Sequence, residues 1–129
     1  METVIGIDLG TQSLKVLFYN PQTREIMASA SAAIDLDQDD QGKAEQLASW
    51  WLDALSDCMA QVPCAIKETA KAIAVSGQQH GFVALDKNGD VLAPVKLWCD
   101  TTTTVECEEL MQALGGEAAC IETLGNPIV

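Results

Sequence analysis

Apolar and polar residues follow one another in short runs over the first third of the chain, and this pattern predicts three strands joined by tight turns. Residues 4–7 form a short apolar run, residues 13–19 read as a second strand, and residues 25–33 can form a third. The segment Asn20-Pro21-Gln22-Thr23 predicts a turn between the last two, because proline presets its φ angle and asparagine hydrogen-bonds locally. The chain therefore opens with a β-meander.

An apolar repeat at three- and four-residue spacing predicts a helix that ends at Pro63. Its apolar positions are Leu47, Trp50, Trp51, Ala54, Leu55, Cys58, Met59 and Val62. The two tryptophans could stack on a sugar, but helical spacing favours packing of most of this stripe on the sheet. The acidic segment 35–42 lacks the ordered ligands and closing glutamate of a calcium loop, so we expect a solvated connection there.

The middle of the chain predicts further strands around a hairpin. Residues 66–69 read as a short connection, and the small residues of 70–76 read as a strand of the kind that is buried between helices. Residues 82–85 and 91–98 read as two strands, because the Asn88-Gly89 pair between them is a strong hairpin signal.

Two helices are expected near the C-terminal end. The segment Thr103-Thr104-Val105-Glu106 has the pattern of a capping box, which opens a helix that runs to about Leu114. The pair Gly115-Gly116 ends it, because glycine readily adopts the left-handed conformation at a helix C-terminus. A second short helix is expected over residues 116–124.

Composition and charge narrow the classes of function. With 129 residues, of which 48% are hydrophobic, the chain is one domain or a piece of one, with enough apolar surface for a core. A formal charge of −12 makes bare nucleic acid and an anionic membrane surface poor partners. It does not exclude ATP, because Mg²⁺ and local backbone dipoles govern phosphate binding.

The cysteines and the absence of targeting signals predict a cytoplasmic protein. The five cysteines are an odd number without paired metal-ligand spacing, so we expect reduced thiols rather than a disulfide or zinc framework. The acidic residue Glu2 lies at the N-terminus and a predicted strand follows at once, which is unlike a signal peptide. No apolar run approaches the roughly 20 residues of a membrane-spanning helix.

A candidate metal–nucleotide site follows the first strand, at Asp8-Leu9-Gly10-Thr11. A carboxylate at a strand end can hold Mg²⁺ through water, and glycine lets backbone N–H groups approach a phosphate. The simpler alternative, a strand that runs into a polar turn, stays open on these residues alone. The sequence lacks the Gly-Lys-Ser/Thr ending of a P-loop and the Gly-x-Gly-x-x-Gly of a Rossmann site.

Three polar loops follow predicted strands, at residues 8–13, 77–81 and 98–102, and their convergence would build a ligand cleft. His80, the only histidine, lies in a polar turn and offers a hydrogen bond to a sugar hydroxyl or carbonyl. Trp98 offers an apolar face to sugar C–H groups, and Asp100 can accept hydroxyl hydrogen bonds. A structural histidine, a core tryptophan and a helix-capping aspartate are the alternatives.

These motifs carry a resemblance to a known family. The opening, residues 4–15, resembles that of sugar kinases, actins and heat-shock chaperone ATPases, and Ile5-Gly6-Ile7-Asp8-Leu9-Gly10-Thr11 is most similar to the FGGY carbohydrate kinases. Within that family, residues 76–81 resemble the Gly-Gln-Met-His-Gly segment of xylulokinases, with Gln79 in place of the methionine. Residues 97–100 resemble their Leu-Trp-(Asn/Cys/Ser)-Asp segment, and the Trp50-Trp51 pair after Glu45-Gln46 is also similar.

The resemblance implies an α/β chain with the actin-like ATPase (ribonuclease H-like) fold, a mixed sheet with flanking helices. Residues 1–129 would be the N-terminal part of the sugar-binding domain, and the nucleotide-binding domain would lie outside this chain, which is then a fragment or a truncated gene product. The implied activity of the full-length protein is ATP-dependent phosphorylation of a ketopentose, D-xylulose to D-xylulose 5-phosphate. The alternatives are another FGGY kinase, acting on gluconate, ribulose or glycerol, and a truncated, non-catalytic sugar-binding module.

The resemblance also assigns roles and partners. Asp8 would hold Mg²⁺ and position the phosphoryl group, while the catalytic-base aspartate would lie beyond Val129. The implied ATP-phosphate residues are Gly10, Thr11, Gln12, Ser13 and Lys15. The implied sugar residues are Gln79, His80, Trp98 and Asp100. The expected partners are ATP, Mg²⁺ and a small-molecule sugar, and a homodimer of the full-length protein stays open.

Overall fold

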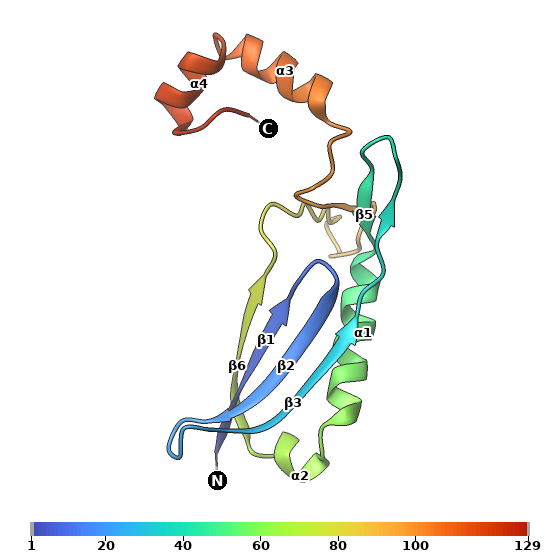
Figure 1. Cartoon of the computed structure of the whole chain (residues 1–129), viewed down its shortest axis with the longest axis vertical. Coiled ribbons are helices and arrows are strands. Elements are labelled where there is room, and N and C mark those ends of the chain that lie inside the picture. Colours follow the sequence, from blue (N-terminus) through green and yellow to red (C-terminus); the bar gives the residue numbers. More distant parts are fainter. Residues whose placement is uncertain (1, 129) are drawn as a thin grey trace.

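The structure is a computed structural model that describes residues 2–128, and it has a mixed α/β architecture (Figure 1). In chain order its elements are β1 Thr3–Leu9, β2 Ser13–Asn20, β3 Glu25–Ala33, β4 Asp37–Gln38, β5 Ala44–Gln46, α1 Ala48–Gln61, α2 Cys64–Lys67, β6 Ala70–Gly77, β7 Val95–Lys96, α3 Thr104–Ala113 and α4 Glu117–Leu124. The predicted meander is confirmed, with β1, β2 and β3 close to their expected bounds.

The main sheet has the order β3-β2-β1-β6. β1–β2 and β2–β3 are antiparallel pairs, whereas β6 lies parallel to β1, with Asp8 opposite Ser76 and Leu9 opposite Gly77. The turn before β3 forms as expected, because the Asn20 side-chain oxygen accepts from the N–H groups of Gln22 and Thr23. The parallel pair brings the C-terminal ends of β1 and β6 side by side, and the segments that follow both strands carry candidate site residues.

The hydrophobic core lies between this sheet and α1. Phe18 and Val16 of β2 are fully buried and pack in one cluster with Ala54 and Cys58 of α1. Burying a side chain such as Phe18 contributes roughly 1.5–3 kcal/mol. Both tryptophans of α1 are partly buried against this cluster, which confirms the expected packing of the helical stripe. Pro63 ends the helix as predicted, but the expected connection at 66–69 is partly the short helix α2.

The expectation that residues 70–76 form a buried strand is correct for the strand but wrong for its burial. The strand exists as β6, but Ile73 and Val75 are 64% and 67% exposed. Their register partners Ile5 and Ile7 belong to the core cluster or pack against it, but α1 makes its main contacts with β2 and β3, not with β6. No other element of residues 2–128 makes substantial contact with β6 apart from β1.

A second, small sheet of order β4-β5-β7 stands beside the end of the main sheet. The acidic connection was expected to be a loop throughout, but Asp37–Gln38 pairs with β5 as the short strand β4. The expected strands at 82–85 and 91–98 are largely wrong. Only β7, Val95–Lys96, is a strand, and the hairpin reduces to isolated bridges at Phe82 and Leu85.

The two C-terminal helices form near their expected positions. Gly115 and Gly116 end α3 with positive φ angles of 97° and 94°, as their sequence predicts. The prediction of a capping box is wrong, because Thr103 is the N-cap residue but makes no side-chain cap bond. The Thr104 hydroxyl instead donates to the carbonyl oxygen of Thr101 at 2.7 Å. Along residues 2–128, every helix is too short or too polar to cross a membrane.

Candidate functional site

Asp8 is the penultimate residue of β1, so the strand runs two residues beyond the expected apolar run of residues 4–7. Its carboxylate is exposed on the sheet face that points away from α1. The register places Lys15 of β2 and Ser76 of β6 directly beside it. These three residues line one end of a shallow depression of about 370 Å³. A carboxylate, an ammonium and a hydroxyl thus lie together at an open sheet face.

The β1–β2 turn, residues 10–12, is tight. The Gly10 N–H donates to the Ser13 carbonyl at 3.0 Å, and a Cβ atom added to Gly10 would lie 3.1 Å from that oxygen. The Gln12 carbonyl accepts from the Ile34 N–H at 2.9 Å. Among the described residues, no acceptor takes the N–H groups of Thr11 and Gln12. Free N–H groups in a tight turn are suited to an anionic ligand.

These residues fit a magnesium–nucleotide ligand. Mg²⁺ is usually held by one or two carboxylates together with waters and substrate phosphates. Asp8 supplies one carboxylate, and nowhere in residues 2–128 do three or more His, Cys, Asp or Glu side chains gather as a metal cluster. Asp8 would therefore hold the metal, while the β1–β2 turn and Lys15 would contact the phosphates.

The segment after β6, residues 77–81, reaches the β1–β2 turn. The Gln78 N–H donates to the Leu9 carbonyl at 2.8 Å, which continues the β1–β6 ladder past the end of the strand. His80 adopts a positive φ of 62°, an uncommon conformation for a residue other than glycine. Gln79 and His80 are both exposed. The left-handed bend at His80 turns the chain away from the sheet and toward β7.

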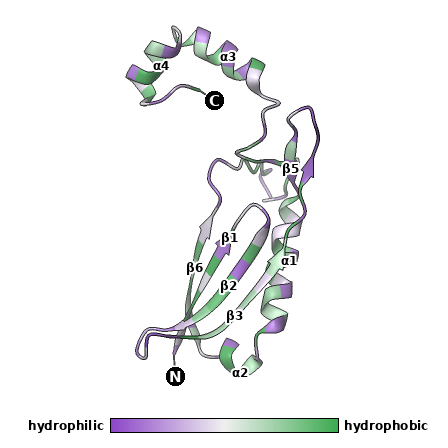
Figure 2. Cartoon of the chain, in the orientation of Figure 1, coloured by the Kyte–Doolittle hydropathy of each residue, from purple (hydrophilic) through white to green (hydrophobic). Residues whose placement is uncertain are grey.

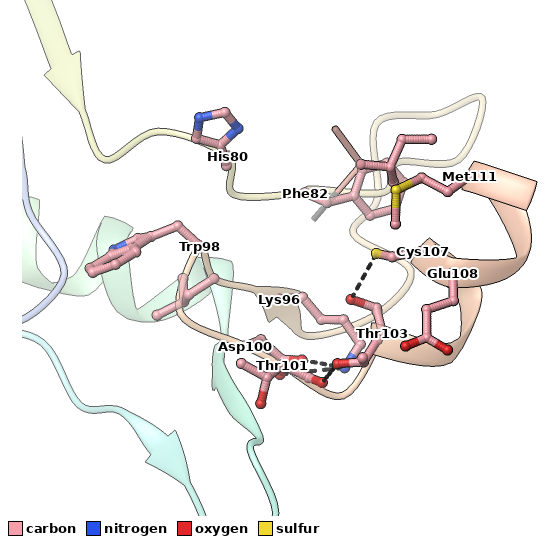
Figure 3. A pocket seen from close by; sticks show the side chains of 13 residues that line it. His80, Phe82, Lys96, Trp98, Asp100, Thr101, Thr103, Cys107, Glu108 and Met111 are labelled. Atoms are coloured by element: carbon pink, nitrogen blue, oxygen red, sulfur yellow. Dashed lines mark hydrogen bonds and ion pairs between the residues drawn. The ribbon is translucent and has the colours of Figure 1, made fainter. Parts of the chain in front are cut away.

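A pocket of about 770 Å³ opens between this segment, the loop after β7 and α3 (Figure 3). We call it the α3 pocket. Its lining includes His80, Phe82, Trp98, Asp100, Cys107 and Met111. Trp98 is 61% exposed, which excludes the core-tryptophan alternative. The structure therefore brings three of the four expected sugar residues together, and Gln79 is outside the residues that line this pocket.

Asp100 lies in the pocket wall, but its carboxylate is directed into the protein. The Ala44 N–H donates to it at 2.8 Å and the Thr102 N–H at 3.0 Å, while the Lys96 ammonium lies 3.5 Å away. Its side chain is only 2% exposed. Burial raises the pKa of this carboxyl, but these hydrogen bonds, one from the Thr102 hydroxyl and the Lys96 charge outweigh burial and lower the pKa to about 2. The geometry favours a loop-supporting role for Asp100 over direct contact with a sugar.

A hydrogen-bond network joins the pocket to the β1–β2 turn. The Trp98 indole N–H donates to the Thr11 hydroxyl at 3.2 Å, and that hydroxyl donates to the Gln78 side-chain oxygen at 3.0 Å. The Gln78 amide donates to the Gln46 oxygen at 3.2 Å, and the Gln46 amide donates to the Thr11 carbonyl at 2.7 Å. Trp51 also donates to Gln46, at 2.9 Å. The roles of Gln46 and Gln78 here were not predicted from the sequence, although both lie inside motifs that carry the family resemblance.

Comparison with known proteins places this chain in a family. The profile described as "FGGY family of carbohydrate kinases, N-terminal domain" matches residues 3–129, and the chain belongs to this family. The expected α/β class with a mixed sheet and the expected family are both confirmed.

The most similar relatives include several xylulose kinases. That of Haemophilus influenzae is 38% identical in an alignment that covers 94% of this chain and 26% of the relative. That of Streptomyces coelicolor is 36% identical over 123 residues, which cover 95% of this chain and 25% of the relative. The chain thus spans about a quarter of the length of these relatives.

Solved structures of sugar kinases also resemble this chain. A xylulose kinase from Rhodospirillum rubrum superimposes with a TM-score of 0.81 at 29% identity, over 99% of this chain and 26% of that chain. A structure described as a "xyloylose kinase" from Brucella ovis gives 0.85 at 28% identity, over 98% and 26%. A Plasmodium falciparum glycerol kinase gives 0.82 at 20% identity, over 100% and 26%, and this likeness shows the fold alone.

Proposed function

We propose that the full-length protein phosphorylates a ketopentose with ATP, and that its substrate is D-xylulose, which becomes D-xylulose 5-phosphate. One observation carries this proposal: the Trp98 wall of the α3 pocket is hydrogen-bonded to the β1–β2 turn, in which the N–H groups of Thr11 and Gln12 have no acceptor among the described residues. A site for a small polar molecule thus adjoins a site for phosphate. The similarity to xylulose kinases at 32–38% identity supports this substrate over other sugars.

The residues divide into two sets under this proposal. Asp8, the β1–β2 turn, Ser13 and Lys15 hold the phosphates and Mg²⁺, which neutralises charge on the transferring group. His80 donates or accepts a hydrogen bond at a sugar oxygen. The exposed side chain of Gln79 also contacts the bound sugar. Trp98 packs on sugar C–H groups. Catalysis of phosphoryl transfer is largely positioning and charge stabilisation, so the distance between the two sets governs the rate.

Other parts of the proposal concern the protein beyond these residues. By the family resemblance, the base that takes the proton from the sugar hydroxyl and the nucleotide-binding domain are supplied outside residues 1–129. The 129-residue chain alone is therefore expected to show no kinase activity. Turnover of xylulose by the purified chain, free of host kinase, would contradict this.

A cytoplasmic location is proposed from the five free thiols, and a homodimer stays a prediction for sedimentation analysis.

The test is a substrate panel with the full-length protein, purified from a host that lacks sugar kinases of this family. ADP formation is measured with MgATP and D-xylulose, D-ribulose, D-gluconate or glycerol. We expect the highest kcat/KM for D-xylulose. A higher value for another compound would assign the protein to another FGGY kinase. Sugar binding without ADP formation on any compound would support a non-catalytic module.

A further inference from the structure

Thr11, Gln46 and Gln78 form a closed ring of hydrogen bonds, which we call the Thr11 ring. Thr11 takes part twice, because its hydroxyl donates to Gln78 and its backbone carbonyl accepts from Gln46. The Gln78–Gln46 bond closes the ring. The ring thus ties together the β1–β2 turn, the end of β5 and the segment after β6.

The direction of every hydrogen bond in the ring is fixed by its surroundings. The Gln46 nitrogen donates to two backbone carbonyls, of Thr11 and Asp35, which can only accept. Its oxygen must then accept, and it receives the Trp51 indole N–H, which can only donate. The Gln78 amide is consequently oriented with its nitrogen toward Gln46 and its oxygen toward Thr11. The Thr11 hydroxyl therefore donates to Gln78 and leaves a lone pair for the indole N–H of Trp98.

The Thr11 ring is more buried than ordinary polar contacts at a protein surface. The Gln46 side chain belongs to a residue with 0% exposure, and Gln78 is half-buried. Across residues 2–128, no buried side-chain nitrogen or oxygen lacks a hydrogen-bond partner. Because Gln46 is fully buried, rotation of its amide would leave a buried group unpaired, and its fixed orientation in turn fixes how Gln78 and Thr11 pair with it.

We propose that Gln46 and Gln78 are positioning residues that fix the β1–β2 turn against Trp98 and so set the distance between the phosphate side and the sugar side of the site. This inference rests on the proposed function. Neither glutamine touches a reacting group under that proposal. They act through Thr11, whose hydroxyl accepts the hydrogen bond that joins the turn to Trp98.

The decisive variant is Gln78→Ala in the full-length protein, because Gln78 is only half-buried and its loss leaves the core cluster intact. The matched control is Gln61→Ala, which removes an exposed amide hydrogen bond of 3.1 Å at the other end of α1. For Gln78→Ala we expect kcat to fall about ten- to a hundredfold, since small misplacements of reacting groups have effects of this size. The KM for the sugar should stay within about twofold, because no predicted sugar contact is lost. The control should match wild type.

A double variant tests whether the two glutamines act as a unit. Gln46→Glu keeps the acceptor for Trp51 but loses the donors to two carbonyls. If both glutamines act through the Thr11 ring, Gln46→Glu with Gln78→Ala should lower kcat no further than the worse single variant. Independent, multiplicative losses would contradict the ring. A fall in kcat that vanishes when the rate is divided by the folded fraction would make both residues merely structural.

The outcomes separate this inference from the proposed function. A wild-type enzyme that is active, with an unchanged kcat in Gln78→Ala, would overturn the positioning role alone. A wild-type protein with no activity on any sugar would overturn the proposed function, and the ring is then tested by amide hydrogen exchange. In Gln78→Ala, the protected N–H groups of Gly10 and Ile34, which hold the two sides of the turn, should exchange about tenfold faster or more. Unchanged exchange would show that the ring does not fix the turn.

Discussion

The sheet with α1 and the region that follows Gly81 differ sharply in how they are packed. The core cluster lies wholly between Ile5 and Val62. In the later region, Val95, Leu97 and Cys120 are the buried hydrophobic residues, while many other apolar side chains are exposed. Figure 2 shows hydrophobic residues along α3 and α4 as well as on the strands that face α1. Both regions therefore contain apolar residues, and they differ in whether these side chains have packing partners within residues 2–128.

This contrast separates the two sides of the candidate site. The β1–β2 turn projects from strands whose inner faces are buried, so its geometry is held by a core of its own. The α3 pocket is lined on one side by α3, which has no fully buried residue. Regions with few buried apolar contacts open locally at lower free energy. The phosphate side of the site is thus expected to be the more rigid one.

The largest expected effect compares one side chain from each region. Phe18→Ala should lower the free energy of unfolding by about 3–5 kcal/mol, because it leaves a cavity under α1. Leu110→Ala in α3, where the side chain is 55% exposed, should change it by about 0.5 kcal/mol or less. Urea unfolding of the 129-residue chain measures both. Equal losses would show that the two regions are packed alike.

Asp8→Ala addresses the rigid side of the site in the full-length protein. If Asp8 holds the metal, kcat should fall by about a hundredfold or more, since metal charge stabilisation contributes several kcal/mol to such reactions. Sugar affinity should change little, because Asp8 lies outside the α3 pocket. Steady-state kinetics with both substrates give the answer. An undiminished rate would remove Asp8 from the metal role.

His80→Ala addresses the less packed side. Loss of one neutral hydrogen bond to a sugar oxygen, about 0.5–1.5 kcal/mol, should raise the sugar KM about three- to tenfold. The KM for ATP should stay the same, because His80 lines the α3 pocket and not the depression at Asp8. If ATP affinity falls and the sugar KM does not move, His80 belongs to the phosphate side.

The smallest effect concerns acid stability. The pKa of Asp100 is lowered from its ordinary value of 3.8 to about 2, so its ionised form stabilises the folded loop. That contribution is fully present above about pH 4 and is lost as the pH falls through about 2. The Asp100→Asn variant should therefore lose less stability than wild type between pH 4 and pH 2. Thermal unfolding over this range measures the difference, and parallel curves would contradict it.

Local sequence patterns predicted the parts of the fold in which local and long-range packing agree. The meander and α1 have apolar repeats that match the faces they bury, and Pro63 marks the end of α1. The strands expected near Phe82 and Val91 failed because an apolar run does not say whether a partner strand lies beside it. The exposure of β6 has the same cause, since a strand's burial depends on what covers it.

The candidate site was predictable as a set of loops but not as a set of contacts. The convergence of the loops at Asp8, His80 and Trp98 followed from strand ends and glycines. The Thr11 ring did not, because Gln46 and Gln78 are 32 residues apart and Thr11 and Gln78 are 67 apart. Asp100 shows the same limit. Its carboxylate could be recognised in the sequence as a hydrogen-bond acceptor, but only the tertiary structure reveals that the N–H groups of Ala44 and Thr102 donate to it.

The parallel pairing of β1 with β6 also has a consequence for the order of assembly during folding. The meander needs only short loop closures, whereas β6 must return to β1 across the whole of β2, β3 and α1. Closing a long loop costs entropy before any contact forms, so pairings distant in sequence tend to form late. From this topology we expect the β1–β2 hairpin to form first and β6 to dock afterwards, carrying Gln78 and His80 with it. Until that step, the outer edge of β1 is an unpaired strand edge, open to intermolecular pairing.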